Sequence, residues 1–155
     1  MNTGSLEQLR RLVERESIDG VKLLENPNDN PICSLCYDKA IRCVTIVWRR
    51  YATSAQYRFI HEAIIQMLQQ YQACKILGDD SDLPVVHAED QQWIIHDWIP
   101  RAKAAGLKAV ATNPSLSFFG RLAISSIQAR MARDIAIRTF PNIHLARNWL
   151  GSFPE

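Results

Sequence analysis

Two cysteines, Cys33 and Cys36, stand in the stretch NPICSLCYDK at the C-x-x-C spacing of zinc knuckles and thiol oxidoreductases. In an extended segment, side chains three positions apart point to opposite faces. A zinc site also needs a second pair of ligands, and the sequence has no second C-x-x-C and no H-x-x-x-H. We therefore predict half-buried strand residues without metal or redox chemistry. A turn at residues 38–40 would place Cys36 opposite Cys43.

An acidic loop follows the short apolar segment 74–77 and contains Asp79, Asp80, Ser81 and Asp82. Open α/β sheets bind ligands at the carboxyl ends of their strands, so this loop is a candidate ligand or partner surface. Three carboxylates in four residues suit a hard cation, but the glycine and the distal Glu of a calcium loop are missing. The other interpretation is a solvated acidic turn. We expect no bound metal and no cofactor.

His96 and Asp97 lie between Trp93 and Trp98, close to Pro100. An imidazole beside a carboxylate can perform acid–base catalysis. No nucleophile is recognisable near this pair, which favours a polar helix face beside a core anchored by tryptophans. Trp93, His96 and Trp98 remain candidates for a ligand or partner surface.

Motifs of common enzyme classes are missing. His61 and Glu62 begin like a zincin helix, but Ile65 occupies the position of the second histidine, so both are predicted to be solvated. The sequence contains no G-x-S-x-G, no Walker loop and no G-x-G-x-x-G. We therefore predict no catalytic residues.

Length and composition indicate one globular domain over residues 1–155. Hydrophobic residues make up 47% and charged residues 22% of the 155 positions, which argues against disorder. A net charge of +2 with interleaved signs gives no reason to expect nucleic acid binding. The apolar runs are far shorter than the ~20 residues of a membrane helix. Without a recognisable secretory signal, a cytoplasmic location is expected.

The elements that must position these residues follow from periodicity. Apolar residues at helical spacing predict a helical extension over 1–19. Strands are then expected at 21–24, 32–37 and 42–48, and a capping box of Thr53 and Gln56 opens a helix over 54–72. Strands and helices alternate afterwards, at 74–77, 89–105 with a kink at Pro100, 107–111, 117–133 and 135–140, before a final helix capped by Asn142. The predicted fold class is α/β with α+β character at the N-terminus: a mixed sheet with helices packed on it, an opening β-meander followed by βα units.

The helix expected over 117–133 has more apolar surface than one buried face requires. An i+4 stripe of Phe119, Ala123, Ile127 and Met131 is predicted to face the sheet. Phe118, Leu122 and Ile124 lie off the centre of that stripe. Surplus apolar surface is commonly buried against a second copy, so we predict a homodimer through this helix or the adjoining Trp98 region. Alternatively, Phe118 and Ile124 join the core of a monomer.

Two stretches of the second half, RAKAAGLKAVATNPS and IRTFPNIHLARNWL, resemble the C-terminal half of STAS-type domains, which include the anti-sigma factor antagonists. From about Val21 the chain is also similar to small bacterial STAS-like or CRAL-TRIO-like proteins of unknown function. The matching residues form a YD…W hairpin and an ED-x-x-W…W-x-P-R-A…G-L stretch: Tyr37, Asp38, Trp48, Glu89, Asp90, Trp93, Trp98, Pro100, Arg101, Ala102, Gly106 and Leu107.

The resemblance implies a STAS-like fold and a non-enzymatic regulatory or protein-interaction module. The alternative, implied by the CRAL-TRIO likeness, is a carrier or sensor of a small apolar or amphipathic ligand, bound under the Trp93/Trp98 helix and the Phe118–Phe119 segment. An uncharacterised enzyme is the third hypothesis. The antagonists are switched by phosphorylation of a serine in a D-S-S/T-G-L-G context, whereas this chain has VVHAEDQQW. The nearby Ser81 stands beside three carboxylates that would repel a phosphate, so no phosphoswitch is expected.

Overall fold

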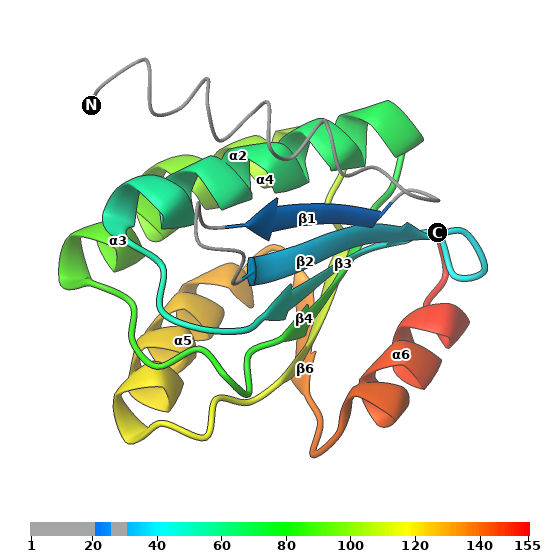
Figure 1. Ribbon diagram of the computed structural model, residues 1–155. Coiled ribbons are helices and arrows are strands. Elements are labelled where there is room, and N and C mark those ends of the chain that lie inside the picture. Colours follow the sequence, from blue (N-terminus) through cyan, green and yellow to red (C-terminus); the bar gives the residue numbers. More distant parts are fainter. Residues whose placement is uncertain (1–20, 26–30) are drawn as a thin grey trace.

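The computed structural model describes residues 21–25 and 31–155, and the helix expected over 1–19 lies outside them. One six-stranded sheet runs through the described chain, with its strands in sequence order (Figure 1). Neighbouring strands are antiparallel from the first to the third and parallel from the third to the sixth. The strands are β1 (Val21–Glu25), β2 (Pro31–Asp38), β3 (Cys43–Trp48), β4 (Lys75–Asp79), β5 (Ala109–Asn113) and β6 (Ala136–Thr139).

Helices cover the two faces of this sheet unequally. Because βαβ crossovers are right-handed and each parallel strand is added on the same side, the connecting helices share one face. Figure 1 shows α6 alone on the other face. The helices are α2 (Ser54–Tyr71), α3 (Ala88–Trp93), η1 (Ile94–Trp98), α4 (Ile99–Ala104), α5 (Phe118–Met131) and α6 (Ile143–Ser152). The predicted class, a mixed sheet with an opening meander followed by βα units, is confirmed.

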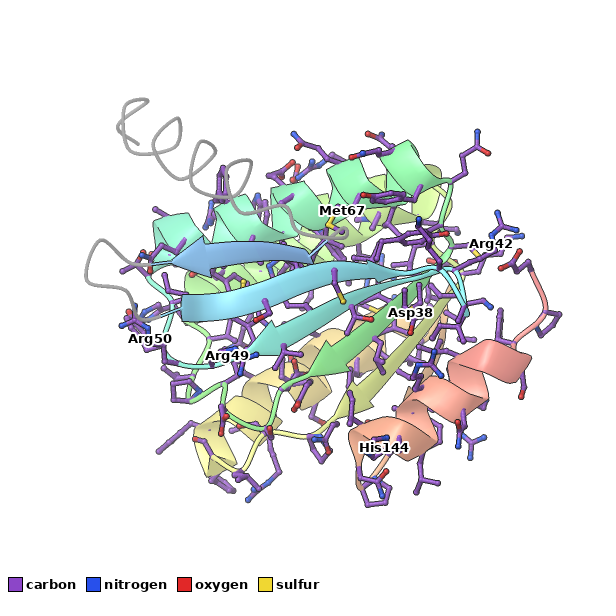
Figure 2. All side chains as sticks on the ribbon, turned by 45° about the vertical axis from the view of Figure 1, so that its right-hand side comes forward. Asp38, Arg42, Arg49, Arg50, Met67 and His144 are labelled. Carbon is purple, nitrogen blue, oxygen red and sulfur yellow. The ribbon has the colours of Figure 1, made fainter. Side chains whose placement is uncertain are left out.

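The core consists of two clusters separated by the sheet. On β3, Val44, Ile46 and Trp48 face the larger cluster beneath α2, α4 and α5, whereas Cys43 faces the smaller cluster beneath α6. This alternation is the period of two that the sequence predicted. The turn between β2 and β3 is tied to the C-terminal helix, since Arg147 Nε donates to Asp38 Oδ2 at 2.9 Å; Figure 2 shows Asp38 in this region.

Helix α2 begins where the sequence predicted. The Gln56 N–H donates to Thr53 Oγ1 and the Thr53 N–H donates to Gln56 Oε1, at 3.3 and 2.9 Å. These two bonds satisfy backbone donors that a helix start otherwise leaves unpaired. The helix ends at Gln72, which adopts a left-handed conformation with φ of +50°. The predicted capping box is confirmed.

The helix expected over 89–105 is continuous but widens in its middle. Its central turn, η1, is a π-helix in which the Ile99 N–H donates to the carbonyl oxygen of Ile94, five residues back. The next residue, Pro100, has no N–H to donate. The irregularity therefore falls one turn earlier than the kink predicted at Pro100, and Trp98 is the last residue of the widened turn.

The half-burial predicted for both cysteines of the C-x-x-C holds for Cys36 and is wrong for Cys33. Cys33 is buried in the larger core while Cys36 is half-buried, opposite Thr45 on the pairing strand. The expectation that Cys36 faces Cys43 is wrong, since Cys43 pairs with Asp38. Burial raises the pKa of Cys33 to about 12, so its thiol stays protonated. Within residues 21–25 and 31–155, no group of three or more His, Cys, Asp or Glu side chains could hold a metal ion.

The stripe predicted for α5 is shifted by one residue at its start. Gly120 is buried with Ala123, Ile127 and Met131, and Phe119 is 67% exposed instead of buried. A Cβ at Gly120 would lie 2.3 Å from Ser115 Oγ and 2.6 Å from the carbonyl oxygen of Leu83. Only glycine fits this contact, so Gly120 faces inward and the bulkier Phe119 points outward. No helix in the described chain is long and apolar enough to cross a membrane.

Candidate functional site

A small cavity lies between the sheet and the helices α2, η1 and α5. Its volume is about 80 Å³. Aliphatic side chains from the strands and from α5 form most of the wall, and three aromatic rings, those of Trp48, Tyr57 and Trp98, complete it. Two titratable side chains besides Tyr57 also reach this wall, the Asp80 carboxyl group and the His61 imidazole.

Asp80 is the residue of the acidic loop that reaches the cavity. It is only 6% exposed. Its backbone is anchored, because its N–H donates to the Asn113 carbonyl oxygen and its own carbonyl accepts from Leu83. No residue in the described chain donates a hydrogen bond to its carboxyl oxygens or forms an ion pair with them. Burial, reinforced by the neighbouring Asp79, raises the pKa of Asp80 to about 7.

The other members of the loop do not share this environment. Asp79 Oδ1 accepts hydrogen bonds from the Ser81 backbone N–H, from Ser81 Oγ and from Asn113 Nδ2, at 3.1, 2.7 and 3.1 Å. Asp82 is exposed to solvent. The three carboxylates therefore do not converge. Of the two interpretations of the loop, the solvated turn fits Asp82, and a site residue fits Asp80.

His61 is not the solvated residue that the sequence predicted. Its Nδ1 donates to the carbonyl oxygen of Tyr57 at 2.8 Å, one helical turn earlier. Four aromatic rings surround the imidazole, with centroid distances from 4.3 to 6.3 Å: those of Trp48, Tyr57, Trp93 and Trp98. Desolvation lowers the pKa of His61 to about 4. The ring is thus neutral near pH 7, with Nε2 as a hydrogen-bond acceptor.

Tyr57 and Trp98 complete the polar rim of the cavity in different ways. The Trp98 indole N–H donates to the carbonyl oxygen of His61 at 2.8 Å, which fixes η1 against α2. The Tyr57 side chain is buried, and its hydroxyl has no hydrogen-bond partner in the described chain. Desolvation and the negative charges of Asp80 and Asp90 raise the pKa of Tyr57, so the hydroxyl remains protonated.

Trp93 and His96 lie outside the cavity. The Trp93 ring is flanked by the guanidinium groups of Arg58 and Arg101, 5.2 and 5.9 Å from its centroid. His96 is exposed and its Nε2 lies 3.1 Å from Gln92 Oε1 on the same helix. Neither residue shares a site with Asp80, so the structure separates this part of the predicted surface from the acidic loop.

The carboxylate of Asp90 locks α3 onto α2. Its oxygen Oδ1 accepts from Arg58 Nε at 2.8 Å and from Ser54 Oγ at 2.7 Å, and the residue is 1% exposed. A buried carboxylate with a charged partner and a further donor is a satisfied structural group. Asp80, which is buried to a similar degree, has no such partner in the part of the chain that the structure describes.

A second, outer pocket of about 160 Å³ adjoins the cavity. The two share Thr112, Ile124 and Gln128 in their walls. Gln128 Nε2 donates to Thr112 Oγ1 at 2.9 Å. Arg121 also lines the outer pocket and donates from Nη1 to the carbonyl oxygens of Ser115 and Leu116 at 3.2 and 3.1 Å. The shared wall places the outer pocket beside α5.

Four large apolar side chains gather on the surface at the start of α5. They are between 60% and 78% exposed, and the rings of two of them meet edge to face with centroids 5.6 Å apart. We call this surface the Phe118 patch; it consists of Leu116, Phe118, Phe119 and Leu122. The predicted surplus of apolar surface on this helix is therefore exposed. Ile124, by contrast, is half-buried and lines the cavity.

The side chains that line the cavity suit the binding of a ligand. None of the described residues lining it is a serine, a cysteine or a lysine. It offers a carboxyl group, a neutral imidazole acceptor, a phenol and aromatic faces. Such a set can hold a ligand by charge, hydrogen bonds and aromatic contact.

Sequence reasoning missed Tyr57 and His61 as site residues. Both stand on the buried side of α2, four residues apart, and His61 precedes the buried Ile64 by three. This i, i+3 and i+4 relation is the signal that could have placed His61 on the inward face. The aromatic rings that enclose it come from other elements, which periodicity within one helix does not reveal.

No protein-family model, no curated protein and no solved structure matches this chain.

Proposed function

We propose that this protein is a non-enzymatic interaction module that associates with a second copy of itself through the Phe118 patch. The exposure of Leu116, Phe118, Phe119 and Leu122 is the observation that carries this proposal. Soluble monomers rarely leave apolar side chains clustered in this way, and clusters of this kind commonly mark an interaction site.

The size of the patch suits an isologous dimer. Each phenylalanine ring has ~150–250 Å² of surface, so four large residues exposed by about two thirds present roughly 500 Å². Pairing of the same patch across a two-fold axis would bury about 1,000 Å² in total, near the lower limit for a specific interface. The dimer is therefore expected to dissociate on dilution.

The alternative of a carrier for a larger apolar ligand has weaker support. Pockets that hold drug-sized ligands typically enclose ~300–1,000 Å³, whereas the cavity beneath Trp98 measures about 80 Å³. Trp98 itself is 3% exposed and belongs to the larger cluster of buried core residues. A filled core combined with an exposed apolar cluster favours a partner over a large cargo.

The family and the cellular setting belong to the same proposal. We keep the STAS-like family, a bacterial origin and a cytoplasmic location as predictions, on the sequence likeness described above. The sequential sheet with its opening meander is compatible with a regulatory domain, but a fold alone does not determine a function.

Paired surface variants test the proposed interface. In F118S/F119S, loss of the two rings should convert the protein to monomer at concentrations where the unmodified chain dimerises, as measured by light scattering after gel filtration. L145S is the matched control, because Leu145 is an exposed apolar residue on α6, outside the patch. A double variant that elutes with the same mass as the unmodified dimer would reject this interface.

A further inference from the structure

The buried carboxyl group of Asp80 has no partner among the described residues, unlike the buried charged groups of Asp90 and Lys75. The buried Asp90 is paired with Arg58, and the buried Lys75 donates from Nζ to the carbonyl oxygen of Ile41 and approaches Glu155 at 3.6 Å. Asp80 is 6% exposed and faces the cavity, and its carboxyl group receives no hydrogen bond from residues 21–25 or 31–155. Burying a carboxylate without a partner is costly, which indicates a site completed by something outside the chain.

The surroundings of Asp80 define the kind of ligand. Trp48, Tyr57 and Trp98 present aromatic surfaces to the same cavity, and the neutral His61 offers Nε2 as a second acceptor. Carboxylates repel anions, and aromatic faces attract cations. A hard metal ion would need several oxygen ligands, and no metal-binding group of three side chains exists in the described part of the chain.

We propose that this cavity binds a small organic ammonium ion, with the Asp80 carboxylate as its counter-ion and the rings of Trp48, Tyr57 and Trp98 around its charged end. This site is independent of the Phe118 patch. Its function would be to sense or hold an amine, without a chemical step.

The volumes limit the size of that amine. At ~30 Å³ for each water-sized group, the inner cavity of about 80 Å³ accepts two to three such groups, a charged nitrogen with one or two carbons. A longer substituent would have to continue past Thr112 and Gln128 into the outer pocket of about 160 Å³. The predicted ligand class is therefore short alkylammonium compounds, or the ammonium end of a somewhat longer molecule.

Gly78 keeps the space beside Asp80 open. This residue lies within β4 and lines the cavity, and a Cβ added to it would stand 3.5 Å from Asp80 Oδ1 and 3.6 Å from Thr112 Cγ2. A larger side chain here would therefore occupy the space in which a ligand meets the carboxylate. The missing side chain at Gly78 and the carboxyl group of Asp80 that faces the cavity are features of one site.

Titration with propylammonium chloride tests the proposal, with propan-1-ol as the neutral molecule of matched size and sodium chloride holding the ionic strength constant. The indole N–H signals of Trp48 and Trp98 in a proton–nitrogen correlation spectrum report on the cavity directly. We expect saturable shifts with a dissociation constant in about the millimolar range for propylammonium, and binding weaker by about tenfold or more for propan-1-ol.

Two variants distinguish binding at the cavity carboxylate from a general effect of surface charge. D80N should weaken propylammonium binding by about tenfold or more, whereas D82N, which removes the same charge from an exposed residue of the same loop, should change it by less than about twofold. Equal binding of propan-1-ol, an equal loss in D82N, or no saturable shift up to about 100 mM would each overturn the proposal. The comparison of the two ligands uses the unmodified chain and decides the matter even if D80N fails to fold.

Discussion

Replacing Asp80 by asparagine should make the unfolding free energy of the protein less sensitive to pH. The pKa of Asp80 is raised from 3.8 to about 7 in the folded state, chiefly because burial disfavours the charged carboxylate. The folded chain therefore binds a proton more tightly than the unfolded chain does. By linkage, the stability that this proton contributes is complete below about pH 4 and is lost as the pH rises to about 7.

The magnitude follows from the size of the shift. Between pH 5 and pH 8 the folded carboxyl group must ionise while the unfolded one is already ionised, which costs roughly 2–3 kcal/mol of unfolding free energy. The titratable groups facing Asp80 are Asp79, beside it, and Tyr57 and His61 on α2; the residues of η1 and α5 that line the cavity are uncharged. Asp79, Tyr57 and His61 remain in D80N. The effects of their own titration therefore cancel when the pH dependence of stability in D80N is subtracted from that of the unmodified chain.

Urea unfolding of both proteins at pH 5 and at pH 8 measures this difference. Between pH 5 and pH 8, we expect D80N to lose roughly 2–3 kcal/mol less unfolding free energy than the unmodified chain. At pH 8, D80N should be the more stable of the two proteins. The lowered pKa of His61 acts in the opposite direction below about pH 6.5, and the subtraction removes it. Parallel pH dependences in the two proteins would show that Asp80 is paired or solvated, which would contradict a buried, unpartnered carboxyl group in the cavity.

Two further substitutions test the packing around the cavity. Trp98→Ala should reduce the unfolding free energy by about 3–5 kcal/mol, because the indole is 3% exposed and bonded to the His61 carbonyl; a denaturant midpoint near that of the unmodified chain would place Trp98 at the surface instead. Gly120→Ala should destabilise by about 1–3 kcal/mol, since its new methyl group would lie within 2.6 Å of the Leu83 carbonyl oxygen. An unchanged melting temperature for Gly120→Ala would mean that the contact of α5 with Ser115 and the Leu83 carbonyl is loose.

Local patterns were sufficient to predict most of the elements. The alternation of Val44, Ile46 and Trp48 predicted β3, and the Thr53–Gln56 capping box predicted the start of α2. Both signals depend only on neighbours along the chain, which explains their success. β4 and β5 were predicted one or two residues too early, because apolar residues mark the buried part of a strand and not its polar end. As a result, Asp79 lies within β4 and not in the loop.

The site was harder to predict because contacts between distant segments create it. Asp79, Asp80 and Asp82 look equivalent in sequence, and only the Asn113 side chain and the cavity distinguish them. Phe119 fits the apolar stripe of α5 as well as Gly120 does. The close approach of Ser115 and the Leu83 carbonyl decides which of them faces inward.

Sedimentation equilibrium of the unmodified chain, from a few to several hundred micromolar, tests the proposed self-association most directly. A monomer has a mass of 17.7 kDa. We expect a weight-average mass that rises with concentration from one chain toward two, as a two-fold dimer of limited interface requires. A mass of one chain at every concentration would contradict it.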